Sequence, residues 1–345
     1  MRIIHELNQL EVGGAERVVL GIAKHDKQNT HTVYSYIDGP MREIFEKAGV
    51  NVLIDSKEKT HDLDVEMIHI HTGGDQSRMA QAVKNAIPTI ETVHSPVASA
   101  VRDEWVSWRV GVSKVVSGMN RKCVTIYNGV DVTRLEAGTG NLRARLGIPD
   151  DAFVIGRLGR VGYDKLVDQF LLACWFASMT GLIPNLHVLV VGNEAKDSRG
   201  YLAKMKVMAA SLPLKNCHFI PGTEDVGDAY RTMDIFMYPS PTEGFGLVYF
   251  EAMACGVPVL TWKTPLTKEL LFGCAWLSAE NTARSLADDL AYFAMNKFVR
   301  DNFAQKGKEV AYRGFTEEVM SFHYQALYKK LYDTAYAGLE PVANA

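Results

Sequence analysis

The chain has 345 residues, of which 47% are hydrophobic and 22% charged, values that are ordinary for a globular protein of about two domains. A formal net charge of −3 argues against a protein whose main partner is nucleic acid. The five cysteines are scattered without any Cys-x-x-Cys pair, which argues against a disulfide framework and against a zinc site. The N-terminus resembles a strand rather than a signal peptide, and no apolar run approaches the ~20 residues that span a bilayer, so we expect a cytoplasmic protein.

The first part of the chain alternates between strand-like and helix-like stretches. Strands are expected at residues 2–7, 32–37, 51–54, 67–71, 88–93, 109–112 and 124–127. Helices are expected at residues 14–25, 41–48 and 76–85. Such alternation builds a parallel sheet with helices on both faces, so we expect one α/β domain over residues 1–135.

A polar, glycine-rich stretch follows this first domain. The run Glu136-Ala-Gly-Thr-Gly-Asn141 is typical of a linker, which we expect over residues 136–148. The alternation then restarts, and a second α/β domain is expected over residues 149–315. Its apolar runs predict buried parallel strands at residues 153–158, 186–191, 217–220, 235–238 and 257–261.

The end of the chain, residues 316–345, begins with a long amphipathic pattern. A helix is expected over residues 316–337, with Thr316 as its N-terminal cap. Helical spacing predicts one apolar face that carries Val319, Phe322, His323, Ala326, Leu327 and Leu331.

The stretch at residues 239–260 carries the strongest chemical signal. A short strand runs into a turn that contains Gly244 and Gly246, and a helix follows. Glycines let a backbone approach a ligand closely, and the first amides of a helix favour a phosphate. Glu243 and Glu251 flank this turn, and since two carboxylates would repel a phosphate, we expect them to hold hydroxyl groups. A phosphate together with hydroxyls indicates a nucleotide attached to a sugar.

This stretch resembles the signature of the retaining glycosyltransferases of family 4. Both glutamates of that family's E-x7-E motif are present as Glu243 and Glu251, and the trailing Glu-Ala-Met-Ala-Cys-Gly-Val-Pro-Val also matches. Further segments resemble the family at residues 13–16, 126–131, 153–160, 188–192, 220–223 and 230–236. The resemblance implies the GT-B architecture, in which two Rossmann-like domains face each other across a cleft and the C-terminal helix packs back across it.

The resemblance also implies which side chains carry the chemistry. Cleavage of the anomeric bond builds negative charge on the departing diphosphate, and Arg160 and Lys165 match the cations that bind it. Arg157 is an alternative to Arg160, but we expect it to lie inside the preceding strand. By the same resemblance, Glu251 binds the ribose hydroxyls and Glu243 contacts hydroxyls of the transferred sugar.

The rest of the implied donor site consists of backbone groups. They belong to Gly13, Gly14, Pro221, Gly222, Gly244, Phe245, Gly246 and Leu247. Because the family recognises the base largely through backbone groups, side-chain identity does not separate UDP from GDP.

Histidines and one acidic pair complete the candidates. His94 matches a family histidine near the donor sugar, which gives His94, Arg160, Lys165 and Glu243 as the catalytic set. His69 and His71 alternate with Ile70, which places both on one face that we interpret as solvated. The pair Asp62 and Asp64 resembles the metal-binding Asp-x-Asp of the other glycosyltransferase architecture, but its polar surroundings indicate a loop. We therefore expect neither a metal nor another cofactor.

The sequence thus predicts a retaining, metal-independent hexosyltransferase. Its donor is of the UDP-glucose or GDP-mannose type, and its acceptor is a hydroxyl of a glycan or glycoconjugate. Two alternatives stay open, a GT-B sugar-nucleotide epimerase, for which no extra acid/base set is found, and a non-catalytic nucleotide-sugar-binding protein. The charges at residues 57–59 and 102–105 are mixed in sign and give no support for membrane contact.

Overall fold

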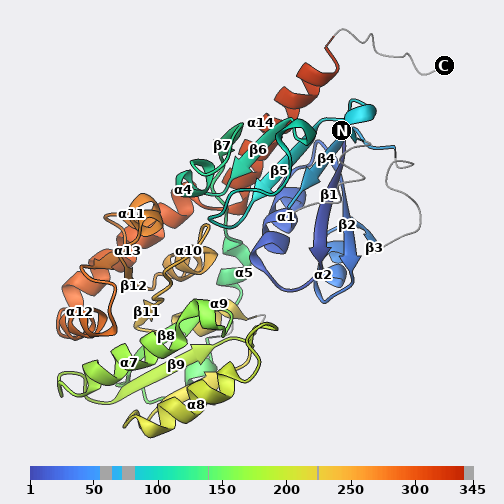
Figure 1. The fold of residues 1–345 in the computed structure, drawn as a ribbon. Helices are drawn as coiled ribbons and strands as arrows, with labels where there is room; N and C mark the ends of the chain where they lie inside the picture. The colour runs from blue at the N-terminus through green and yellow to red at the C-terminus, as the bar shows by residue number, and fades with distance from the viewer. Residues whose placement is uncertain (55–63, 72–81, 139, 224, 338–345) are drawn as a thin grey trace. The chain divides into compact units, whose positions relative to one another are not determined.

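The computed structural model describes residues 1–54, 64–71, 82–138, 140–223 and 225–337 (Figure 1). The chain divides into two compact units, Met1–Gly129 with Glu317–Ala345, and Val130–Thr316. Each unit contains one sheet of parallel strands, which confirms the α/β class with two Rossmann-like units. No helix within the described ranges is long and apolar enough to cross a membrane.

The first unit is built on a seven-stranded sheet with the order β3-β2-β1-β4-β5-β6-β7. Its strands are β1 Arg2–Gln9, β2 Thr30–Ile37, β3 Asn51–Ile54, β4 Met67–Ile70, β5 Thr89–Val93, β6 Trp108–Gly111 and β7 Cys123–Thr125. Its helices are α1 Gly14–His25, α2 Met41–Lys47, α4 Lys114–Ser117 and α14 Glu317–Ala335, with a 3-10 turn η2 at Asp103–Trp105. These strands confirm the predicted ones. Most of the helix predicted at 76–85 lies outside the described residues, as does Asp62.

The C-terminal helix α14 belongs to the first unit, where it packs beside α1 on one face of the sheet. Its buried stripe is Met320, Tyr324 and Tyr328, which pack with Ile3 of β1 and other apolar side chains. The predicted helix is therefore confirmed, and Leu327 and Leu331 of its predicted face pack against the core. The rest of that prediction is wrong, since Phe322, His323 and Ala326 are exposed. Aromatic rings spaced four residues apart form the buried face, and a tyrosine can bury its ring while its hydroxyl finds a partner.

The second unit has a six-stranded sheet with the order β10-β9-β8-β11-β12-β13. Its strands are β8 Phe153–Leu158, β9 Leu186–Val191, β10 Cys217–Ile220, β11 Ile235–Met237, β12 Val259–Trp262 and β13 Trp276–Ser278. Its helices are α5 Val132–Glu136, α6 Leu142–Arg145, α7 Val167–Ser178, α8 Tyr201–Ser211, α9 Val226–Arg231, α10 Leu247–Ala254, α11 Pro265–Leu271, α12 Ala283–Met295 and α13 Lys297–Gly314, with a 3-10 turn η3 at Tyr163–Lys165.

The boundary between the units differs from the prediction. The units divide after Gly129 rather than after residue 135, and residues predicted as a linker at 136–148 are part of the second unit. The backbone amides of Asn141 and Leu142 both donate to Asp228 Oδ2, at 3.3 and 3.0 Å. Part of the predicted linker is therefore the short helix α6, whose start is held by hydrogen bonds to Asp228.

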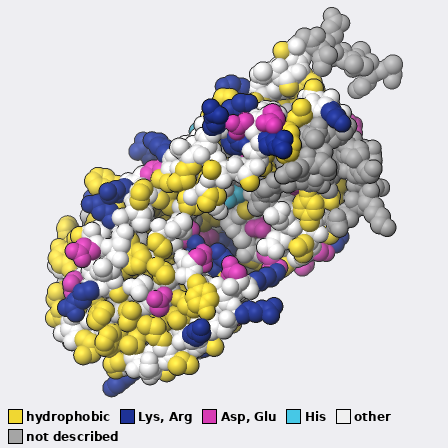
Figure 2. Space-filling model, viewed as in Figure 1, with side chains coloured by type: hydrophobic (Ala, Val, Ile, Leu, Met, Phe, Trp, Pro, Cys, Tyr) yellow, Lys and Arg dark blue, Asp and Glu magenta, His cyan; other side chains and the backbone are white. Residues whose placement is uncertain are grey.

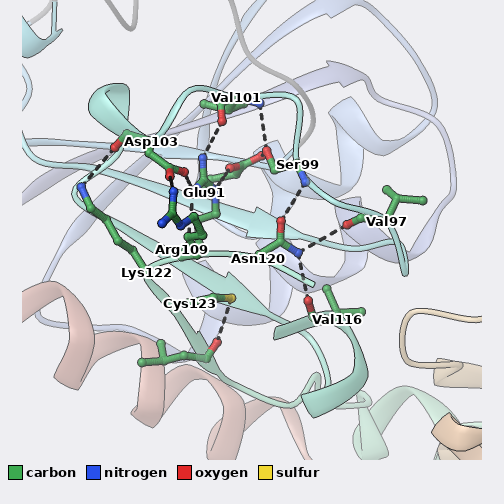
Figure 3. Close-up of polar contacts among 12 residues, drawn as sticks. Glu91, Val97, Ser99, Val101, Asp103, Arg109, Val116, Asn120, Lys122 and Cys123 are labelled. Carbon is green, nitrogen blue, oxygen red and sulfur yellow. Dashed lines mark hydrogen bonds and ion pairs between the residues drawn. The ribbon is translucent and has the colours of Figure 1, made fainter. Parts of the chain in front are cut away.

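A buried arginine holds the loop that follows β5 (Figure 3). Arg109 of β6 is only 2% exposed, and its Nε donates to Glu91 Oε2 of β5 at 2.7 Å. The same guanidinium donates to the carbonyl oxygen of Val101 and to the carboxylate of Asp103 in η2. Ser99 donates to the other oxygen of Glu91. The segment between β5 and β6 is thus tied to both strands by charge-assisted hydrogen bonds.

We predict that Arg109→Met lowers the free energy of unfolding by about 3–5 kcal/mol, because Glu91 would keep a buried charge without its partner. Chemical denaturation followed by circular dichroism measures the change. The matched control is Arg121→Met, since Arg121 is 89% exposed and approaches Asp103 only to 3.9 Å. The control should stay within about 0.5 kcal/mol of the parent. Equal effects of the two substitutions would contradict this account of the loop.

Candidate functional site

The order of strands places the candidate residues of the second unit at one edge of its sheet. The strand order reverses between β8 and β11, and β8 and β11 are neighbours in the sheet. In open parallel sheets, ligands bind at the carboxyl ends of the strands beside such a reversal. The loop after β8 carries Arg160 and Lys165, and the loop after β11 carries Glu243.

Lys165 and Glu243 meet at this edge. Lys165 Nζ lies 2.8 Å from Glu243 Oε1, and their side chains are only 12% and 16% exposed. Ser240 Oγ donates to the same carboxylate oxygen at 2.9 Å. Asp164 lies farther from the ammonium, at 3.4 Å. The structure therefore brings together two residues that are 78 positions apart in the sequence, and it orients the carboxylate from two sides.

The two arginines near this pair differ sharply in burial. Arg160 is 56% exposed and pairs with Asp164 at 3.2 Å, an exposed contact that constrains it weakly. Arg157 is 0% exposed and lies inside β8, as the sequence analysis expects. Its Nη2 donates to the carbonyl oxygen of Arg160, and its guanidinium carbon lies 5.2 Å from the centre of the Tyr238 ring. Arg157 Nε and Nη1 find no hydrogen-bond partner among the described residues. Burial lowers the pKa of this guanidinium.

Glu251 lies on α10 and has two partners that the sequence analysis missed. Arg134 Nη2 lies 2.9 Å from its Oε1, and the Tyr230 hydroxyl donates to its Oε2 at 2.8 Å. Burial and the nearby Glu251 raise the pKa of Tyr230 well above its ordinary value, so the hydroxyl stays protonated and donates. Arg134 lies beside the stretch predicted as a linker, which offered no local sign of this role.

The glycine turn before α10 has the geometry that its residues predict. Gly246 precedes the helix with φ +80°, a left-handed conformation that favours glycine, and no side chain caps the helix start. Phe245 is buried and stacks on Phe250 with ring centres 4.9 Å apart, so its side chain belongs to the core. Only backbone groups of this turn therefore remain for a ligand. The amide of Gly222, in contrast, already donates to Asn193 Oδ1 at 3.0 Å.

In the first unit, the amides that open α1 face a carboxyl group. Gly13 is the N-cap of α1 without a side-chain cap, and a Cβ at Gly13 would collide with Glu16. Burial raises the pKa of Glu16 to about 7. The place where the sequence analysis expects a phosphate or an acceptor is thus next to a buried acid from the first turn of the same helix.

The histidines of the first unit form a connected group. His94, just beyond β5, has its Nε2 3.1 Å from His71 Nδ1. His69 and His71 share one face of the sheet as predicted, but both are buried, so the prediction of a solvated face is wrong. The cause is that α14 covers this face, since its Tyr328 hydroxyl lies 2.7 Å from His69 Nδ1. The described member of the acidic pair, Asp64, pairs with Arg2 at the surface.

Comparison with known proteins identifies the second unit. Residues 139–310 match the family model described as glycosyl transferases group 1. The chain belongs to this family. Over 198 residues it is 31% identical to a D-inositol 3-phosphate glycosyltransferase of Saccharomonospora viridis, a match that covers 55% of this chain and 46% of that protein. Over 170 residues it is 29% identical to the lipopolysaccharide core biosynthesis mannosyltransferase LpsB of Rhizobium meliloti, covering 48% of this chain and 46% of LpsB. The match therefore spans about half the length of these relatives.

Solved structures show the same fold over nearly the whole chain. Anabaena Alr3699/HepE, solved in complex with UDP and glucose, aligns with a TM-score of 0.80 at 19% identity and covers 96% of this chain and 100% of its own. A sucrose-phosphate synthase from Thermosynechococcus elongatus aligns with a TM-score of 0.76 at 18% identity, covering 97% of this chain and 100% of its own. This chain thus shares the GT-B fold with these solved structures, as the sequence predicts.

We predict that Arg157→Met leaves the free energy of unfolding unchanged or raises it by about 1–4 kcal/mol, because a buried guanidinium with unpaired N–H groups is replaced by an apolar side chain. Chemical denaturation measures the difference. Arg160→Met is the matched control at an exposed position, with an expected change within about 0.5 kcal/mol. Destabilisation of Arg157→Met by several kcal/mol would show that the guanidinium is well paired in the folded protein.

Proposed function

We propose that this member of the glycosyl transferases group 1 family is a retaining, metal-independent glycosyltransferase. It transfers a hexose from a nucleoside diphosphate sugar to a hydroxyl of a glycan or glycoconjugate. The observation that carries the proposal is the Lys165–Glu243 pair, which lies at the strand-order reversal of the second unit. The family match over residues 139–310 supports it, since those residues contain every donor-site side chain of this unit.

The leaving diphosphate is the group that needs stabilisation, because charge develops on it as the anomeric bond breaks. Arg160 is proposed to bind it, since its only ion pair with a described residue is an exposed one with Asp164. Lys165 contributes a point charge, and the first amides of α10 contribute the positive end of a helix dipole. These groups together supply the charge stabilisation that a divalent cation provides in other transferases, so the proposed reaction needs no metal.

The two glutamates are proposed to hold hydroxyl groups. Glu251 is oriented in advance by Arg134 and Tyr230, which reduces the entropy lost when it binds the ribose. Glu243 Oε1 accepts hydrogen bonds from both Lys165 and Ser240, so a sugar hydroxyl would bind at Oε2. A carboxylate held by an ammonium is a poor nucleophile, which fits a front-face displacement in which the leaving phosphate helps to deprotonate the acceptor.

Donors of the UDP-glucose and GDP-mannose types are both proposed. HepE has been solved with UDP-glucose, and LpsB is named as a mannosyltransferase. On the face shown in Figure 2, basic and acidic side chains of the described residues are interspersed, so this face does not indicate a membrane-bound acceptor. His94 is proposed to act on the reacting sugar from the first unit. A cytoplasmic setting is proposed because all five cysteines are free thiols.

The donor is tested by thermal unfolding with UDP, GDP and ADP in the presence of EDTA, followed by the matching sugar nucleotides. A ligand that binds only the folded state stabilises it by about 2.7 kcal/mol at a hundred times its Kd. We expect one diphosphate to raise the melting temperature without metal, and Glu251→Gln to weaken that effect. The absence of any shift from a well-folded sample would contradict the proposed donor site.

We predict that Glu243→Ala lowers the turnover of transfer by about 100-fold or more, because interactions that position the sugar are lost. Binding of the nucleoside diphosphate should change by less than about threefold, as measured by isothermal titration calorimetry. Glu243→Gln, which keeps the shape of the side chain, guards against a purely structural effect. The matched control is Glu280→Ala, an exposed carboxylate of the same unit. Unchanged turnover in both Glu243 variants would refute the assignment.

A further inference from the structure

Four histidines of the first unit form a file that crosses its sheet. They come from β2, from β1, from just beyond β4 and from just beyond β5, which are consecutive strands in the sheet, and they are His31, His5, His71 and His94. Successive rings are joined by nitrogen–nitrogen contacts. The distances are 2.9 Å from His31 Nδ1 to His5 Nε2, 3.1 Å from His5 Nδ1 to His71 Nε2, and 3.1 Å from His71 Nδ1 to His94 Nε2. The first three side chains are buried and His94 is partly exposed.

Neutral imidazoles in such a file share one direction. A neutral ring has one N–H donor and one acceptor nitrogen, so each ring that accepts from one neighbour donates to the other. Burial lowers the pKa of His5 and His71 well below the ordinary value and that of His94 to about 4. With all four rings neutral, the file has two arrangements, with every N–H pointing toward His31 or every N–H pointing toward His94.

Asp26 lies at the buried end of the file and distinguishes the two arrangements. Its Oδ2 is 3.2 Å from His31 Nε2, which is within ion-pair distance but outside hydrogen-bond geometry. The same carboxylate accepts from the Gln28 amide at 3.1 Å and from the Asn29 side chain at 2.6 Å. Burial alone would raise the pKa of Asp26, but the hydrogen bond from Asn29 and the neighbouring His31 ring outweigh it and hold the pKa below its ordinary value. An ionised carboxylate only accepts, so it favours the arrangement in which His31 carries its hydrogen on Nε2.

We propose that Asp26 is a positioning residue that acts through His31, His5 and His71 to fix His94 with its hydrogen on Nε2 and its lone pair on Nδ1. Every Nε2–H of the file then points toward Asp26. His94 consequently presents an acceptor nitrogen, which suits the hydroxyl of a sugar and not the oxygen of a phosphate. The choice of a sugar hydroxyl as ligand rests on the proposed function, whereas the tautomer of His94 does not.

A metal site is the competing interpretation of the same histidines. One ligand atom each of His5, His69 and His71 lies within 4.8 Å of the others. However, both nitrogens of His69 already have hydroxyl partners, Tyr328 at 2.7 Å and Thr92 at 2.8 Å. A metal bound to all three rings would also have to replace hydrogen bonds of the file, because both nitrogens of His5 and of His71 are engaged in it. The hydrogen-bonded file accounts for these contacts without such rearrangement.

The tautomers are read by long-range nitrogen–proton NMR on protein labelled with nitrogen-15 in histidine. The spectrum distinguishes protonated from unprotonated ring nitrogens, and His94→Gln assigns its signals. We expect His94 Nε2 to be protonated and Nδ1 unprotonated. In Asp26→Asn the amide can donate to His31 Nε2, so we expect the file to reverse and His94 to carry its hydrogen on Nδ1. Asp38→Asn, at an exposed aspartate of the same unit, is the control and should leave the signals unchanged.

Several results would overturn the proposal. Protonated Nδ1 in the parent protein would do so, as would an unchanged His94 tautomer in folded Asp26→Asn. If that variant does not fold, His31→Phe breaks the file at its first histidine, and an unchanged His94 tautomer in that variant has the same meaning. Stoichiometric binding of Zn²⁺ that shifts the signals of His5, His69 and His71 would favour the metal site instead.

Activity supplies a separate readout. Asp26→Asn should lower kcat for transfer by about tenfold while nucleoside diphosphate binding is unchanged, because general acid–base and positioning effects of one group are of this order or larger. If the parent protein transfers no sugar but shows the expected tautomers, the proposed function fails and the positioning role of Asp26 stands.

Discussion

The reversal of strand order in each sheet is the constraint on which the rest of the structure depends. Parallel strands need crossover connections, and these put every loop that follows a strand at the same edge of the sheet. Where the order reverses, beside β1 in the first unit and beside β8 in the second, two such loops diverge and leave the strand ends accessible. The Lys165–Glu243 pair exists because β8 and β11 are neighbours at this point, although they are distant in the sequence.

The buried arginines Arg109 and Arg157 differ in how many of their nitrogens have hydrogen-bond partners. Arg109 is almost fully paired, with a carboxylate, a backbone carbonyl and an acidic turn as partners, and it secures the loop after β5. Arg157 has the same burial but leaves two nitrogens without partners among the described residues. A paired buried charge is costly to disrupt, whereas an unpaired one costs stability while it is present. Arg109 therefore stabilises the fold, whereas Arg157 lowers the stability of the folded protein.

In the histidine file, hydrogen bonds between rings couple the tautomer of His94 to a carboxylate at the other end, Asp26. When its rings are neutral, the file has a direction set by the tautomers, and in our proposal a carboxylate at one end selects that direction. The aromatic stripe of α14 covers the same face of the sheet. The Tyr324 hydroxyl is hydrogen-bonded to Thr92, and the Tyr328 hydroxyl is hydrogen-bonded to His69. The C-terminal helix therefore contributes partners to the polar network as well as apolar surface to the core.

Local patterns in the sequence determined the two α/β units, their strands except β13, and the glycine turn before α10, whereas Lys165, Glu243 and Glu251 became candidates through the family resemblance. These features depend on periodicity and on residue types within short windows, which any single chain displays. The tertiary structure decided the buried face of α14, the packing of residues 136–148, and the partners of Glu251, one of which lies 117 positions away. It also decided that His5, His31, His71 and His94 meet. Those contacts follow from the order of strands and the helix that covers them, and neither is encoded in the spacing of residues along the chain.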